Sequence, residues 1–132
     1  MTRHCVPVRI YYEDTDFSGN VYHAAYLKFF ERGRTELLRD LGLHHAELAE
    51  QGIAFAVRQM EIAFVAAARI DDLLTVTTEV AEAGGVRLVL DQTILRDDKV
   101  ITTARVTVVA IKMSGGPARL PAHLRARLVP GA

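Results

Sequence analysis

Residues 20–41, NVYHAAYLKFFERGRTELLRDL, carry the clearest structural pattern in the chain. From residue 22 onward, apolar or small side chains recur every three or four positions, and charged side chains fill the positions between them. This period places the apolar side chains on one face of a helix of about five turns. Gly42 marks its end, because glycine readily adopts the left-handed conformation that closes helices. The expected apolar face consists of Tyr22, Tyr26, Phe29, Phe30, Gly33, Leu37 and Leu41.

Short strands and turns are predicted on both sides of this helix. Residues 6–12 are rich in strand-forming side chains and lead into the turn formers of residues 13–20. Gly84-Gly85 predicts a turn, and the polar residues 96–99 suit a tight hairpin between two strands. The remaining expected elements are helices over 45–50 and 122–128 and strands over 58–64, 74–80, 86–95 and 100–112.

The order of these elements indicates the fold class. The helices come early and hairpin-linked strands follow, which is typical of an α+β domain. We therefore expect one domain, residues 1–132, in which an antiparallel β-sheet wraps the long central helix. Residues 106–111 place apolar side chains on both faces of the sheet. A helix that covers only one face would leave the apolar side chains of the other face exposed to water. A second copy of the chain is expected to cover that face.

Composition and charge restrict the functions that this chain can have. Sixteen Lys and Arg residues balance sixteen Asp and Glu residues, which argues against nucleic-acid binding driven by bulk positive charge. No stretch reaches the ~18 apolar residues of a membrane span, and residues 1–9 lack the apolar run of a secretory signal. The single cysteine, Cys5, forms no disulfide within the chain and fits a reducing compartment. We expect a cytoplasmic protein.

A candidate catalytic site lies where the turn enters the long helix. Asp14 and Asp16 precede the first helical turn, whose backbone N–H groups have no acceptor within the helix. Such N–H groups can hold the oxyanion of an acyl-transfer intermediate, and each donor is worth roughly two to three orders of magnitude in rate. Asp16 beside them is a candidate base or nucleophile. The residues alone leave a second interpretation open, in which Asp14, Asp16 and Asn20 only cap the helix.

One motif, D-x-x-G-x-V-Y-H-x-x-Y over residues 16–26, resembles the active-site signature of hotdog-fold acyl-CoA thioesterases of the 4-hydroxybenzoyl-CoA thioesterase superfamily. The chain departs from the usual pattern at Ser18 and Asn20, where small or apolar residues are common, and at Gly33, where alanine is common. Further stretches are similar to the bacterial YbgC subfamily, which is associated with the Tol-Pal system. These stretches are VRIYYEDTD (8–16), FERGRTE (30–36), VRQM (57–60) and ARIDDL (68–73).

The resemblance implies a hotdog fold and a homo-oligomer, in which dimers join two sheets and often pair into tetramers. It implies hydrolysis of an acyl-CoA, without a separate cofactor because CoA is part of the substrate. Asp16 is then the catalytic carboxylate that attacks the thioester or activates water, and the His23 backbone N–H receives the thioester oxygen. The His23 side chain is a further candidate, by hydrogen bonding near the thioester or by orienting water. A CoA thiolate leaves without strong acid help, because its pKa is near the ~8.5 of free cysteine.

The same resemblance supplies candidates for substrate binding. The phosphates of CoA call for a few basic side chains near the pocket, and Arg69 is the one proposed first. Aromatic side chains such as Phe17, Phe29, Phe55 and Phe64 either line an acyl tunnel or fill the core. The expected substrate-binding residues are Gly19, Val21, Tyr22, Tyr26, Arg58, Met60 and Arg69, with Lys112 and Arg119 as further basic candidates.

Other functions compete with this prediction. A serine hydrolase is disfavoured because Ser18 and Ser114 are the only serines and no G-x-S-x-G elbow surrounds them. The histidines show no metal-ligand spacing such as H-E-x-x-H. The alternative is a non-catalytic module that binds acyl-CoA or an acyl-carrier protein, although a binder needs no ionised carboxylate beside a thioester. Peripheral association with a membrane or with lipid-synthesis proteins is compatible with either function.

Overall fold

The computed structural model describes residues 3–128 of the chain. This part contains helices, strands and one short 3-10 turn. In chain order the elements are β1 (His4–Arg9), η1 (Tyr12–Asp14), α1 (Ala25–Asp40), α2 (His45–Glu50), β2 (Ile53–Phe64), β3 (Leu73–Ala83), β4 (Arg87–Arg96), β5 (Lys99–Lys112) and α3 (Ala122–Arg127).

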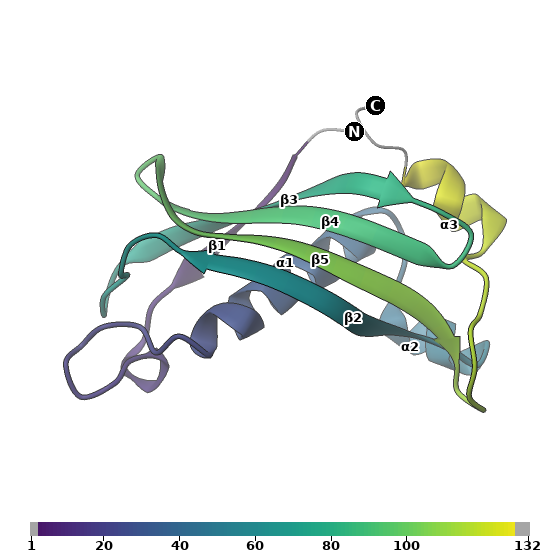
Figure 1. Ribbon diagram of the computed structural model, residues 1–132, viewed down its shortest axis with the longest axis horizontal. Helices are drawn as coiled ribbons and strands as arrows, with labels where there is room; N and C mark the ends of the chain where they lie inside the picture. The colour runs from purple at the N-terminus through teal and green to yellow at the C-terminus, as the bar shows by residue number, and fades with distance from the viewer. Residues whose placement is uncertain (1–2, 129–132) are drawn as a thin grey trace.

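The five strands form one antiparallel sheet with the order β1-β3-β4-β5-β2. The long helix α1 lies across one face of this curved sheet (Figure 1). The segment that leads into α1 lies at the opposite end of the sheet from α2 and α3 (Figure 1). The structure therefore confirms the α+β class and the predicted arrangement of a central helix wrapped by an antiparallel sheet.

The apolar face of α1 packs closely against the sheet. Phe29 and Phe30 are fully buried. A Cβ atom added to Gly33 would lie 2.8 Å from Val76 Cγ1 and 3.0 Å from Gln92 Nε2. The glycine thus allows the helix to approach the strands, and this contact offsets the roughly 1 kcal/mol that glycine costs inside a helix.

The start of α1 differs from the prediction, whereas its end agrees with it. The helix begins at Ala25, and Tyr22 lies in the preceding turn with 51% of its surface exposed. The reason is that the Tyr22 N–H donates to the Asp14 carbonyl at 2.9 Å, which keeps Tyr22 in that turn. At the other end Gly42 adopts a φ of 81°, and the next residue donates its N–H to the Leu38 carbonyl at 2.9 Å. These bonds form the expected glycine-closed helix end.

Two strand boundaries also differ from the prediction. β1 ends at Arg9. The Ile10 N–H still donates to the Asp72 carbonyl at 2.9 Å, but the Ile10 carbonyl accepts the N–H of Asp71, whose φ of 73° is left-handed, so regular strand pairing stops there. β2 begins at Ile53 rather than at residue 58, because its first residue already pairs with the last residue of β5. The predicted hairpin between β4 and β5 is confirmed. Its two turn residues, Asp97 and Asp98, have φ values of 50° and 68°, as in a type I′ turn.

In the described part of the chain, neither a helix that could cross a membrane nor a group of possible metal ligands is found. None of its helices is both long and apolar enough to cross a bilayer. Within residues 3–128, no three His, Cys, Asp or Glu side chains are grouped so that they could hold a metal ion. Cys5 is a free thiol on β1 with an exposed side chain.

Candidate active site

The segment between η1 and α1 is a compact turn that carries Asp16. The Asp16 N–H donates to the Asn20 carbonyl at 2.9 Å, and the Gly19 N–H donates to the Asp16 carbonyl at 3.1 Å. Gly19 has a φ of 84°, a left-handed conformation in which any side chain would be strained. Gly19 therefore determines the shape of the turn and, through it, the position of the Asp16 carboxylate. We call residues 14–23, which contain the candidate catalytic residues, the catalytic turn.

Hydrogen bonds from Ser18 hold the Asp16 carboxylate. Its Oδ1 accepts the Ser18 hydroxyl and also the Ser18 N–H, the latter at 2.8 Å. Both hydrogen bonds lower the pKa of Asp16 below its ordinary value, and the bond from the hydroxyl contributes more than the bond from the N–H. Together they outweigh desolvation, which would raise this pKa. The side chain is exposed. An accessible carboxylate that is ionised at neutral pH meets the first requirement of a base or a nucleophile.

Neither acidic residue of the turn caps α1. Asp14 Oδ2 accepts the Tyr11 N–H at 2.9 Å and so closes the 3-10 turn η1. Asp16 accepts hydrogen bonds from Ser18, within its own turn. The N-cap residue of α1 is Ala24, which has no side-chain hydrogen bond. The helix-capping interpretation therefore does not describe these two carboxylates.

The backbone at the start of α1 offers free hydrogen-bond donors. Within residues 3–128, the N–H groups of His23 and Ala24 have no acceptor. The partial positive charge of a helix N-terminus favours an oxyanion at such a position. The exposed His23 ring lies against the Tyr22 ring at a centroid distance of 4.5 Å and against the Phe64 ring at 6.2 Å. This end of the helix can therefore polarise a carbonyl group and carries an imidazole beside it.

The loop between β2 and β3 supports the catalytic turn from one side. The Val21 N–H donates to the Ala68 carbonyl at 2.8 Å, and the Ile70 N–H donates to the Gly19 carbonyl at 3.0 Å. Tyr26, in the first turn of α1, accepts the Ala68 N–H at its hydroxyl oxygen at 3.1 Å. Burial raises the pKa of Tyr26, so its hydroxyl stays neutral. The turn, the helix start and this loop are thus joined by direct hydrogen bonds.

An ion pair holds the β2–β3 loop itself. Asp72 Oδ2 accepts a hydrogen bond from Arg96 Nη1 at 2.8 Å and from the Arg69 N–H at 2.9 Å. Arg96 also donates to the Ala67 carbonyl at 3.1 Å. Desolvation alone would raise the pKa of Asp72, but the Arg69 N–H and the Arg96 guanidinium outweigh it and leave the pKa below its ordinary value. The supporting loop is therefore stabilised by a charged side-chain contact.

Most of the predicted site residues meet at this end of the sheet. Arg69 forms a β-bridge with Asn20, and Met60 is partly buried against the core cluster that contains Tyr26. The residues brought together are Asp16, Gly19, Val21, Tyr22, His23, Tyr26 and Arg69. The basic candidates that lie elsewhere are Arg58, exposed at the bulge in β2, Lys112, paired with Ile53 at the far end of the sheet, and Arg119, beside Gly85.

The sequence did not predict which contacts hold the candidate catalytic side chains. The bond from Ser18 to Asp16 has a local signal, because a serine two residues after an aspartate often donates to its carboxylate. The contact of Phe64 with the His23 ring has no such signal, since the two residues are distant in sequence. Of the other aromatic candidates, Phe29 belongs to the core and Phe17 is 99% exposed.

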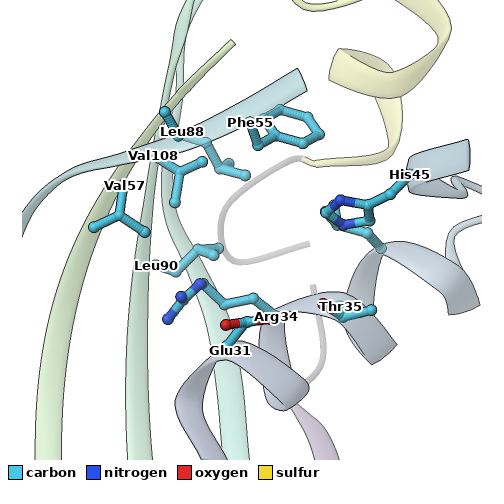
Figure 2. Close-up of a pocket in the computed structure, with 11 residues that line it drawn as sticks. Glu31, Arg34, Thr35, His45, Phe55, Val57, Leu88, Leu90 and Val108 are labelled. Atoms are coloured by element: carbon cyan, nitrogen blue, oxygen red, sulfur yellow. The ribbon is translucent and has the colours of Figure 1, made fainter. Parts of the chain in front are cut away.

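A cavity of about 450 Å³ lies between the sheet and the helices, away from the catalytic turn. Phe55 comes from β2, Leu88 and Leu90 come from β4, and Val108 comes from β5 (Figure 2). Polar side chains line the opposite wall (Figure 2): Glu31, Arg34 and Thr35 on α1, and His45 on α2. Cavities of this size and mixed lining are typical of small-molecule sites. No sequence pattern predicted this cavity.

Comparison with known proteins identifies the family. Residues 11–128 match the model of the thioesterase-like superfamily. An acyl-CoA thioesterase YbgC from Haemophilus influenzae is 43% identical over 122 residues, which cover 91% of this chain and 90% of that protein. The chain belongs to the thioesterase-like superfamily. Its similarity to YbgC confirms the resemblance predicted from the sequence motifs.

Solved structures of related thioesterases share the fold. A probable thioesterase from Bartonella henselae superposes with a TM-score of 0.87 at 46% identity, covering 91% of this chain and 100% of that chain. A 1,4-dihydroxy-2-naphthoyl-CoA thioesterase from Synechocystis has a TM-score of 0.88 at 22% identity, with 96% of each chain covered. The second likeness shows the fold alone. Together they confirm the predicted hotdog fold for this member of the superfamily.

Proposed function

We propose that this chain hydrolyses acyl-CoA thioesters at the catalytic turn. One observation supports the proposal most directly: the ionised Asp16 carboxylate, held by Ser18, precedes a helix start with free N–H groups at His23 and Ala24. Acyl transfer needs a base or nucleophile and donors for the oxyanion, and this segment supplies both. Membership of a thioesterase superfamily supports the same reaction.

The proposed reaction begins when the thioester oxygen accepts a hydrogen bond from the His23 N–H. Asp16 then attacks the carbonyl carbon, or it removes a proton from a water molecule that attacks instead. The negative charge of the tetrahedral intermediate rests on the oxygen bound by the N–H donor. The carbon–sulfur bond breaks and CoA leaves as a thiolate, whose pKa near ~8.5 requires little protonation. On the first route, water hydrolyses the acyl–aspartate anhydride and regenerates Asp16.

Side chains around the turn are proposed to bind the rest of the substrate. The His23 ring would hydrogen-bond near the thioester or orient water. The exposed Arg69, which bridges to Asn20, would meet the phosphates of CoA. Tyr22 and Tyr26 would flank the acyl group close to the thioester.

The two edges of the sheet support a proposal about the homo-oligomer. β1 has six residues and includes Pro7, which has no N–H to donate to another strand. β2 has twelve residues, contains no proline, and exposes side chains such as Val57, Arg58 and Phe64. A long unpaired edge of this kind invites another strand. We therefore propose a dimer in which β2 pairs with β2 of a second copy about a two-fold axis, with tetramers formed by pairs of dimers.

Such a pairing would bring the catalytic turn of one protomer beside the cavity of its partner. Phe64 contacts His23 at one end of β2, and Phe55 lines the cavity near the other end. Within one protomer these positions are about 30 Å apart along the strand, at ~3.3 Å per residue. Antiparallel self-pairing places the Phe64 end of one strand against the Ile53 end of the other. Arg58 and Met60, near the middle of β2, would then also lie close to the shared site.

We also propose a cellular location and further contacts. A cytoplasmic location agrees with the single, unpaired cysteine. A peripheral contact with a membrane or with lipid-synthesis proteins would use exposed aromatic side chains near the turn: Tyr11, Tyr12, Phe17 and Tyr22. CoA belongs to the substrate, and the proposed mechanism uses no separate cofactor.

The proposed function is tested by release of free CoA from a panel of short, long and aromatic acyl-CoAs. The wild type is compared with Asp16→Asn and Asp16→Ala, and circular dichroism checks that each variant is folded. We expect turnover by the wild type and a loss of roughly a hundredfold or more in both variants. Absence of turnover by a wild type that still binds acyl-CoA would contradict the proposal and favour the non-catalytic binding module.

A further inference from the structure

The cavity between the helices and the sheet has two chemically different walls. The strand side is apolar and consists mainly of Phe55, Leu88, Leu90 and Val108 (Figure 2). The helix side is polar: it carries Glu31, Thr35 and His45 and, among them, the guanidinium of Arg34. A cavity that only accommodated hydrocarbon would not need charged side chains on one wall, because removing charge from water beside apolar groups is costly.

Arg34 is anchored but keeps unused donors. Its Nη1 donates to Gln92 Oε1 at 3.0 Å. Gln92 is itself held by two further bonds, from Nε2 to the Phe30 carbonyl at 2.9 Å and to Thr78 Oγ1 at 3.0 Å. A guanidinium has five N–H groups, of which this contact uses one. The anchor therefore fixes the position of the guanidinium without saturating it.

No carboxylate forms an ion pair with Arg34 within the described residues. The ion pairs found in residues 3–128 do not include it, although the Glu31 carboxylate on the same helix is near enough to act on its charge. Burial lowers the pKa of Arg34, as expected for a cation partly removed from water. Half-buried arginines with free donors commonly bind oxygen acceptors of ligands, since the planar fork matches a carboxylate.

We infer that this cavity selects an acyl group whose far end carries an oxygen acceptor, a carboxylate or a hydroxyl, which Arg34 binds. The inference rests on the proposed thioesterase function and adds the class of acyl group. The thioester would lie at the catalytic turn of one protomer, and the acyl chain would extend along the apolar wall of the partner's cavity. Its terminal oxygen would then reach the guanidinium.

Two substrates that differ only at the far end test the inference. Octanoyl-CoA ends in a methyl group, whereas octanedioyl-CoA ends in a carboxylate. For the wild type we expect octanedioyl-CoA to have the higher kcat/KM, by roughly tenfold to a hundredfold, the effect of one hydrogen bond to a charged group. Arg34→Met should abolish or reverse this preference while octanoyl-CoA is still hydrolysed, and Arg34→Lys should restore part of it.

A matched control separates this role from a general effect of charge on α1. Arg39 lies on the same helix, is exposed, and pairs with Glu36 outside the cavity. Arg39→Met should leave the substrate preference unchanged. If Arg34→Met lowers kcat/KM for both substrates by the same factor, or if the wild type does not prefer octanedioyl-CoA, the inference is wrong.

A binding measurement keeps the inference testable without turnover. Calorimetry with the free acids should show tighter binding of octanedioate than of octanoate to the wild type, and no difference for Arg34→Met. If octanedioate binds more tightly in this way but the protein hydrolyses neither thioester, the assignment of Arg34 as the group that binds a terminal oxygen holds, and the thioesterase proposal fails. Equal binding of the two acids to the wild type would overturn the assignment whatever the hydrolysis assay shows.

Discussion

The catalytic turn and the cavity are built in different ways. The turn is exposed and polar, and backbone hydrogen bonds among Asp16, Gly19 and Asn20 give it its shape. The cavity is lined mostly by apolar side chains from separate helices and strands, with Arg34 as its anchored cation. In the proposed function the first region would supply the reactive groups, and the second would supply volume and one oriented donor for the acyl group. The contrast suggests that chemistry and acyl selectivity can be changed separately in this protein.

Enlarging the cavity should have the largest effect on stability. Leu90 is 1% exposed and lines the cavity, so Leu90→Ala should lower the free energy of unfolding by about 2–5 kcal/mol. It should also shift the preferred acyl group toward bulkier ones. Denaturant unfolding and a panel of acyl-CoAs measure the two effects.

The control for this prediction is Leu120→Ala. Leu120 is also buried but does not line the cavity. It should cost a similar free energy without changing the preferred acyl group. If Leu120→Ala changes the preferred acyl group, or if Leu90→Ala does not, the cavity does not determine which acyl group is preferred.

The ion pair that supports the turn should contribute less. Arg96→Met leaves Asp72 without its charged partner, and we expect a loss of about 1–3 kcal/mol at neutral pH. Because the folded-state pKa of Asp72 is lowered, this contribution is present above its ordinary pKa of ~3.9 and is lost as the pH falls through the folded value. The difference between wild type and variant should therefore shrink in acid, as denaturant titrations at several pH values would show.

A second ion pair provides the comparison. Arg105 and Asp91 pair on the exposed face, with side chains 57% and 46% exposed. Arg105→Met should cost only about 0–1 kcal/mol. Equal losses in Arg96→Met and Arg105→Met would mean that the pair beneath the catalytic turn has no special structural role.

Strain in the catalytic turn should affect activity more than stability. Gly19→Ala would force a side chain into a φ of 84°, at a cost of about 1–2 kcal/mol. Gly52 has a φ of 76° and equally open surroundings, so Gly52→Ala should cost the same. Only Gly19→Ala should reduce kcat, because it moves Asp16. Parallel loss of activity in both variants would argue against a positional role for Gly19.

The smallest expected effect concerns the charge of Asp16. Ser18→Ala removes the hydroxyl that contributes most to lowering the pKa of Asp16, so that pKa should rise toward the ordinary ~3.9. Carboxyl-carbon NMR titration would measure it, with Ser114→Ala as a control distant in sequence. The acid limb of the kcat/KM profile should move to higher pH in the same variant. An unchanged Asp16 titration would contradict the assigned hydrogen bond.

Sequence reasoning succeeded where the determinants lie close together in the chain. Asp16, Gly19 and His23 fall within one short stretch, so the motif and its turn chemistry could be recognised together. The glycine-closed end of α1 and the Asp97-Asp98 hairpin were predicted for the same reason. In each case the local backbone conformation follows from residue types that are adjacent in sequence.

The parts that were not predicted depend on contacts across the fold. Arg34 meets Gln92 only because α1 packs on β4, and Phe64 meets His23 only because β2 ends beside the start of α1. No hydrophobic period or motif spacing in the sequence predicts either contact. The start of α1 was predicted too early, because Tyr22 fits the helical period but is held in the preceding turn by its backbone hydrogen bond.

In the proposed dimer, the catalytic turn of one protomer would act on an acyl group held in the cavity of its partner. Asp16→Asn disables the turn, and Val57→Trp would fill the cavity from its exposed lining position. The decisive measurement is CoA release from octanedioyl-CoA by each variant alone and by a mixture refolded together. If each site is shared across a two-fold axis, random pairing makes about half of the dimers mixed. A mixed dimer has one intact site out of two, so the mixture should recover about a quarter of the wild-type activity. Activity no greater than the average of the separate variants would contradict a shared site.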